Sequence, residues 1–180
     1  MRCIKFAWTG LAAIMLLGAH AEAAEFSANF SGFQEVGGVG AGQTGAIFTQ
    51  GKGKLELELK NGPPALTYRL TYSGLSSGVT QAHVHFGKVH VGGGIIAFFC
   101  SNLANPPPGT PACPANAGTV TGTITPGSVI GPIAQGITAG NFDALAAAIN
   151  SNTAYGNIHT INFPAGEIRG QIRHGLGEND

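Results

Sequence analysis

Residues 55–72 read LELELKNGPPALTYRLTY and hold two alternating segments joined by a turn. Leucines alternate with glutamates over residues 55–59, so an extended chain places the leucines on one face. The NGPP turn at residues 61–64 breaks the pattern, and residues 66–72 then place leucines and tyrosines on one face. These segments predict an antiparallel hairpin with one face packed against a core.

Further strands are predicted along the chain, separated by Gly-rich and Pro-rich turns. They cover residues 82–86, 95–99, 118–125, 155–161 and 167–172. One short helix is predicted over residues 142–149, because Asn141 can accept a bond from a free backbone N–H and the following alanines favour helix. Many short strands at this spacing predict an all-β protein, an antiparallel β-sandwich or barrel of the Greek-key type.

The first residues have the features of a secretory signal peptide. Arg2 and Lys5 precede an apolar run at residues 11–17, and alanines follow up to Ala24. The run is shorter than the roughly 20 residues that cross a membrane. We therefore predict a signal peptide at residues 1–24, one exported domain at residues 25–176 with no membrane span, and a disordered tail at residues 177–180. The exported domain would be periplasmic or secreted.

Two cysteines, Cys100 and Cys113, remain once the predicted signal peptide is removed. Exported thiols oxidise readily, so we predict a disulfide that bridges the Pro-rich loop between them and contributes about 3 kcal/mol. The alternative is a pair of thiolate metal ligands, although no CxxC spacing is present.

The charge of the chain argues against a nucleic-acid partner. Nine basic and nine acidic residues leave no net charge when the histidines are neutral, so no basic field is available to attract nucleic acid.

The strongest chemical feature is the stretch AHVHFGKVH at residues 82–90. On a strand, His83 and His85 share one face while the residues between them face the core. His90 and the later His159 are the candidates to complete a cluster, and three or four neutral imidazoles suit copper or zinc. Without a metal, these histidines would instead hydrogen-bond the loop that covers them.

Glu167 and Arg169 alternate with apolar and small residues on a predicted strand, so their side chains share one face. We predict that they form an ion pair with a structural role. A second interpretation makes Arg169 a guide for an anion beside a redox-active metal.

Several of these segments together resemble the CHRD domain, the module named after chordin, over residues 26–172. They are FQEV at 33–36, LTY at 66–68, SGL at 73–75, AHVH at 82–85 and HTINFPAGEIRGQ at 159–171, and the last is the most specific. The resemblance implies an architecture rather than an established reaction.

A weaker resemblance concerns the histidine strand. HVHFG at residues 83–87 is similar to the copper-ligand strand of copper/zinc superoxide dismutases, which are also Greek-key β-sandwiches. That resemblance implies an arginine near the metal that guides the anionic substrate, and Arg169 has a similar place in chain order. The zinc-binding run of those enzymes has no counterpart here.

We therefore expect an exported CHRD-domain protein that binds a metal ion, with copper favoured and zinc possible, through His83, His85, His159 and His90. Its role would be metal handling in the cell envelope. One alternative is a copper-dependent redox enzyme of the superoxide dismutase type. The other is a structural or protein-binding module without metal.

Overall fold

The computed structural model describes residues 23–37 and 45–175. Residues 1–22 of the predicted signal peptide and the predicted tail lie outside the described residues. The strands are β1 (Ala24–Ser31), β2 (Lys52–Asn61), β3 (Pro64–Ser73), β4 (Val79–Phe86), β5 (Gly94–Ser101), β6 (Gly118–Ile124), β7 (Ala154–Thr160), β8 (Ile168–Gln171) and β9 (Arg173–His174). The helix α1 (Phe142–Asn150) and the short turns η1 (Gly32–Gln34), η2 (Pro126–Ser128) and η3 (Ile133–Gln135) complete the elements.

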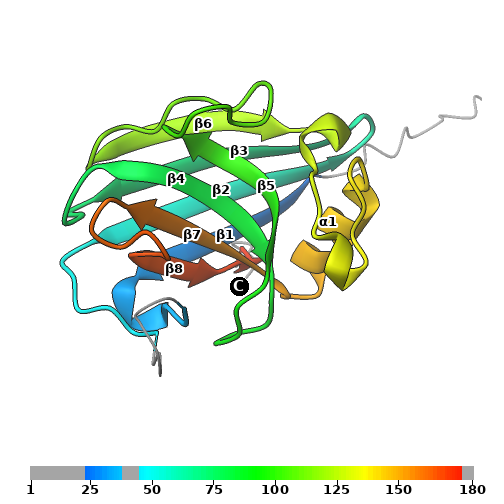
Figure 1. Cartoon of the computed structure of the whole chain (residues 1–180). Coiled ribbons are helices and arrows are strands. Elements are labelled where there is room, and N and C mark those ends of the chain that lie inside the picture. The colour runs from blue at the N-terminus through cyan, green and yellow to red at the C-terminus, as the bar shows by residue number, and fades with distance from the viewer. Residues whose placement is uncertain (1–22, 38–44, 176–180) are drawn as a thin grey trace, which may run out of the picture.

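The strands form one antiparallel sheet that curls into a nearly closed barrel (Figure 1). Their order is β5-β4-β7-β8-β1-β2-β3-β6, with β9 also paired to β1. The two end strands, β5 and β6, lie close together, which brings the edges of the sheet near closure. β3 pairs with β6 and β4 pairs with β7, so strands that are not consecutive in the sequence are neighbours in the sheet, as in a Greek key. The predicted fold class is confirmed.

The predicted hairpin is the pair β2 and β3, and its inward face is the one that the alternation indicates. Leu57 lies opposite Tyr68 in the register, and both side chains are buried. The Tyr68 hydroxyl donates to the carbonyl of Phe99 at 2.6 Å, so this buried polar group is satisfied. Packing of leucines and tyrosines from one face therefore builds the core and ties β3 to β5.

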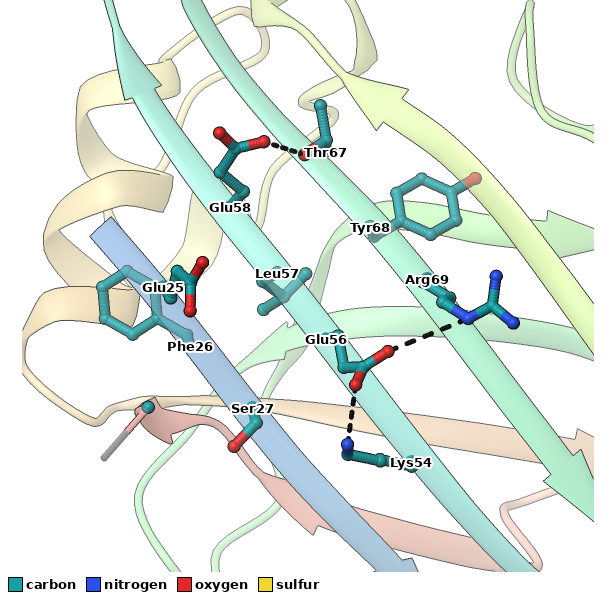
Figure 2. A pocket seen from close by; sticks show the side chains of 11 residues that line it. Glu25, Phe26, Ser27, Lys54, Glu56, Leu57, Glu58, Thr67, Tyr68 and Arg69 are labelled. Atoms are coloured by element: carbon teal, nitrogen blue, oxygen red, sulfur yellow. Dashed lines mark hydrogen bonds and ion pairs between the residues drawn. The ribbon is translucent and has the colours of Figure 1, made fainter. Parts of the chain in front are cut away.

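The opposite face of this hairpin is a solvated, charged surface. Figure 2 shows Glu56 between Lys54 and Arg69, with Lys54 Nζ 2.6 Å and Arg69 Nε 3.8 Å from its carboxylate oxygens. These side chains are about half exposed, so their ion pairs contribute little to stability.

Two local predictions are confirmed. The Asn141 side chain accepts a hydrogen bond from the backbone N–H of Ala144 at 3.0 Å, which caps α1. Cys100 and Cys113 form a disulfide with an S–S distance of 2.11 Å, which excludes a thiolate site for this pair.

Within the described residues, no helix has the length and apolar character to cross a membrane.

Candidate metal centre

Three histidines gather on two neighbouring strands, β4 and β7, which lie side by side in the sheet (Figure 1). His83 and His85 come from β4 and His159 comes from β7. In the register, His159 lies opposite Gln81 while His83 lies opposite Asn157. One nitrogen from each of the three rings lies within 4.8 Å of the others. The sheet therefore brings the predicted pair and the distant His159 to one point.

The rings lie on the strand face that points away from the barrel core, yet they are buried. The exposed fractions of His83, His85 and His159 are 0%, 7% and 8%. The ring of Phe98 packs against His83 with their centroids 4.3 Å apart. Neighbouring side chains and loops thus cover this face, which the two-residue alternation of the strand alone does not reveal.

Each imidazole is held by a hydrogen bond through one ring nitrogen. His83 Nε2 lies 3.0 Å from Oε1 of Gln81, and the carbonyls of Gly93 and Pro164 lie 3.0 Å from Nδ1 of His85 and His159. All three partners are oxygen acceptors, so the held nitrogens carry the proton. This arrangement fixes the tautomer and orientation of each ring, as the outer partners of metal-binding histidines do.

The other nitrogen of each ring carries a free lone pair. These atoms, Nδ1 of His83 and Nε2 of His85 and His159, are buried and have no hydrogen-bond partner in residues 23–37 and 45–175. Buried polar atoms without a partner are rare, because leaving one unpaired costs about 1–3 kcal/mol. Because one nitrogen of each ring also lies within 4.8 Å of the others, the group fits a metal ion that accepts nitrogen ligands.

The environment keeps the three rings neutral. Burial lowers the pKa of His83 to about 2, with a further decrease from neighbouring histidine charge. Burial also lowers the pKa of His85 to about 4 and lowers the pKa of His159. A neutral imidazole is the form that binds metal, so the site needs no deprotonation at neutral pH.

Arg169 and Tyr155 form a stack beside His85. The Tyr155 ring is parallel to the His85 ring, with centroids 4.8 Å apart, and the Arg169 guanidinium carbon lies 3.4 Å from the centre of the same Tyr155 ring. Nη2 of Arg169 donates to the carbonyl of Lys88 at 3.0 Å. The stack secures the loop after β4, whose Gly93 carbonyl also accepts from His85.

The predicted ion pair between Glu167 and Arg169 is wrong. The Glu167 carboxylate accepts hydrogen bonds from the hydroxyls of Thr49, Ser76 and Thr160 at 2.6–2.8 Å, and from the Ser76 N–H at 2.9 Å. Burial raises the pKa of Glu167, but these bonds outweigh it and leave the pKa below its usual value. Glu167 lies directly before β8, and its carboxylate is turned to Thr49, Ser76 and the last residue of β7, Thr160.

Glu35 is a buried carboxyl that the sequence did not single out as a functional residue. It is 5% exposed and accepts a hydrogen bond from the side-chain amide of Asn157. Burial raises the pKa of Glu35 to about 8, although the charge of Arg169 and the Asn157 bond both lower it. The one feature of the sequence that could have indicated Glu35 is its place in the FQEV segment, which contributes to the family resemblance.

His90 lies apart from the group of three. It is exposed in the loop after β4, with a backbone φ of 60°. The group of donor atoms within 4.8 Å contains His83, His85 and His159 but not His90. Its participation as a fourth ligand stays a prediction.

The structure thus defines a nearly closed Greek-key β-barrel with a buried three-histidine group on its outer face. The model of the CHRD domain family matches residues 26–172. The chain therefore belongs to the CHRD domain family, and the matched region includes every residue of the candidate site. Comparisons with curated proteins and with solved structures gave no match.

Proposed function

We propose that this protein is exported and binds one copper ion through His83, His85 and His159, with a role in metal handling in the cell envelope. One observation carries the proposal: three imidazoles, each held through one nitrogen and left with a buried, unpaired second nitrogen, bring one nitrogen each within 4.8 Å of the others. Outer hydrogen bonds of this kind orient metal ligands and raise their affinity.

Copper is favoured over zinc on chemical grounds. Imidazole serves both metals, but for a given set of nitrogen ligands the affinity for divalent copper exceeds that for zinc. The donor group holds no carboxylate within the described residues, which argues against calcium and magnesium because they prefer oxygen ligands. In this proposal the protein stores, delivers or detoxifies copper.

Export is supported by the disulfide and by the sequence of the first residues. Cys100 and Cys113 are bonded, and such bonds persist in oxidising compartments outside the cytosol. Cell fractionation, with mass spectrometry of the purified protein, tests this part: we expect a processed chain outside the cytosol. An unprocessed cytosolic chain would contradict it.

Elemental analysis and copper titration of the mature protein test the binding. We expect stoichiometric copper in the wild-type protein and its loss in the double variant His83→Ala/His85→Ala. The matched control is His174→Ala, which removes an exposed histidine of β9 and should leave uptake unchanged. His90→Ala shows whether the loop histidine contributes. Failure to take up copper or zinc at micromolar concentration would reject the proposal and favour a structural module.

A copper-dependent redox enzyme of the superoxide dismutase type is the second candidate, and one observation favours it. Nη1 of Arg169 is buried and has no hydrogen-bond partner within the described part of the chain, so it is able to donate to a small anion. The test compares superoxide consumption by the copper-loaded protein, its Arg169→Gln variant and an equal amount of free copper. Activity no higher than that of free copper would reject this candidate.

A further inference from the structure

The donor group of the candidate site carries no negative charge. Its members within residues 23–37 and 45–175 are His83, His85 and His159, with no carboxylate or thiolate among them. Each ring is neutral, because one nitrogen carries the proton toward an oxygen acceptor and the other nitrogen is buried without a partner for a second proton. The ligands therefore leave the charge of a bound ion unchanged, at one positive charge for a monovalent ion and two for a divalent ion.

Because the site is buried, the charge of the bound ion affects the free energy of binding. The three donor nitrogens have almost no solvent contact. The idealised cost of moving an ion from water to a low-dielectric interior rises with the square of its charge, so a divalent ion costs about four times as much as a monovalent ion of the same size. A buried, neutral donor set consequently favours the ion of lower charge.

The charged groups around the site act in the same direction. Arg169 stacks on Tyr155, which stacks on His85, so a positive charge lies beside the donor group. The charge of Arg169 therefore opposes a second positive charge on a bound ion.

Glu35 and Glu167, the buried carboxyl groups of the described chain, are engaged in other contacts. Glu35 bonds to Asn157 and faces the charge of Arg169, and its raised pKa keeps it mostly protonated at neutral pH. Glu167 is ionised, but its oxygens accept bonds from Thr49, Ser76 and Thr160. Neither group is placed to neutralise a second positive charge on the metal.

The number of ligands favours the same monovalent ion as the charge does. At a zinc site with three protein ligands the fourth ligand is a water molecule, and divalent copper prefers a tetragonal set. Cu(I), with a filled d shell, is stable with three ligands in a plane and does not require a water molecule in the buried site. Building on the copper binding proposed above, we propose that this site selects copper as Cu(I), in preference to Cu(II) and Zn(II).

The affinities of the mature, full-length protein for the three ions test the selection. Cu(I) is titrated anaerobically with ascorbate against bicinchoninate, and Cu(II) and Zn(II) are titrated against chelators of known affinity. We expect Cu(I) to bind at least about tenfold more tightly than Cu(II), which corresponds to a rise of about 59 mV in the one-electron reduction potential relative to copper in water.

Substitutions of Arg169 separate the effect of charge from simple disruption. Arg169→Gln should narrow the preference for Cu(I) over Cu(II), whereas Arg169→Lys, which keeps the charge, should retain it. The matched control is Arg69→Gln on the exposed face of β3, which should change neither affinity. Circular dichroism of each variant verifies the fold.

The outcomes distinguish this inference from the proposed function. Tighter binding of Cu(II) or Zn(II) than of Cu(I) would overturn the selection while leaving metal binding in place. An unchanged preference in a folded Arg169→Gln variant would overturn the electrostatic origin. Failure to bind copper in either oxidation state would reject both the selection and the proposed function.

Discussion

Acidification from pH 7 to pH 5 should destabilise the metal-free protein through its buried histidines. In the unfolded chain a histidine has a pKa near 6.5 and takes up most of a proton over this range. The folded protein does not, because burial lowers the pKa of His83 to about 2 and that of His85 to about 4. The unfolded state therefore binds more protons, and each of these histidines lowers the free energy of unfolding by about 2 kcal/mol.

Glu35 acts in the opposite direction over the same range. Burial raises its pKa to about 8, so the folded state holds a proton on Glu35 that the unfolded state has lost. By the same linkage, the free energy of unfolding rises by about 2.5 kcal/mol when the pH falls from 7 to 5. The two histidines together remove about 4 kcal/mol, so the net loss in the wild-type protein is about 1–2 kcal/mol before any contribution from His159.

The variant Glu35→Gln removes the stabilisation that protonated Glu35 provides at low pH. The effect of the histidines on the free energy of unfolding can then be measured alone. Urea unfolding of the metal-free protein at pH 7 and pH 5 should show a loss of about 4 kcal/mol or more in Glu35→Gln, clearly larger than in the wild type. The control His174→Ala should follow the wild type. A loss below about 1 kcal/mol in a folded Glu35→Gln variant would refute the inference that burial keeps these histidines neutral.

Three further predictions concern the scaffold. The variant Cys100→Ser/Cys113→Ser removes a disulfide between residues 13 positions apart. We expect it to lower the free energy of unfolding by about 3 kcal/mol. A Tm equal to that of the oxidised wild type would contradict this. Gly156→Ala places a Cβ against the ring of Phe30 in the core. Urea unfolding should therefore show a free energy of unfolding that is lower by about 1–3 kcal/mol. An unchanged midpoint would show that the ring moves freely. Asn141→Ala removes the cap of α1 and should cost about 1 kcal/mol in thermal unfolding, while Asn141→Asp, which can still cap, should cost less.

Much of the fold was predictable from local patterns. The alternation of residues 55–72 indicated the hairpin of β2 and β3 with its inward leucines and tyrosines, because the two-residue repeat of a strand sorts side chains onto two faces. Asn141 and the alanines after it indicated α1. Strand β1 was not predicted, since Phe26, Ala28 and Phe30 form a weak pattern that becomes informative only when β2 pairs with it.

The candidate site was predictable in part. The spacing of His83 and His85 placed them on one face, and His159 was expected to join them, which the structure confirms as a geometric group. The expected pairing of Glu167 with Arg169 was wrong, because hydroxyl donors from three separate segments hold the carboxylate instead. Neither Glu35 nor the Tyr155 stack was foreseen, since each depends on contacts between segments far apart in the chain.

The sequence by itself determined the faces of the strands, the turns between them and the kinds of ligand available, because these depend on the order of neighbouring residues. Only the tertiary structure decided that the outer face of β4 and β7 is buried and that each imidazole is held through one nitrogen with the other left free. His85 and His159 are held by the carbonyls of Gly93 and Pro164, which loops bring to the rings, and His83 is held by the side chain of Gln81. The chemical character of the site therefore comes from how the loops close over the sheet.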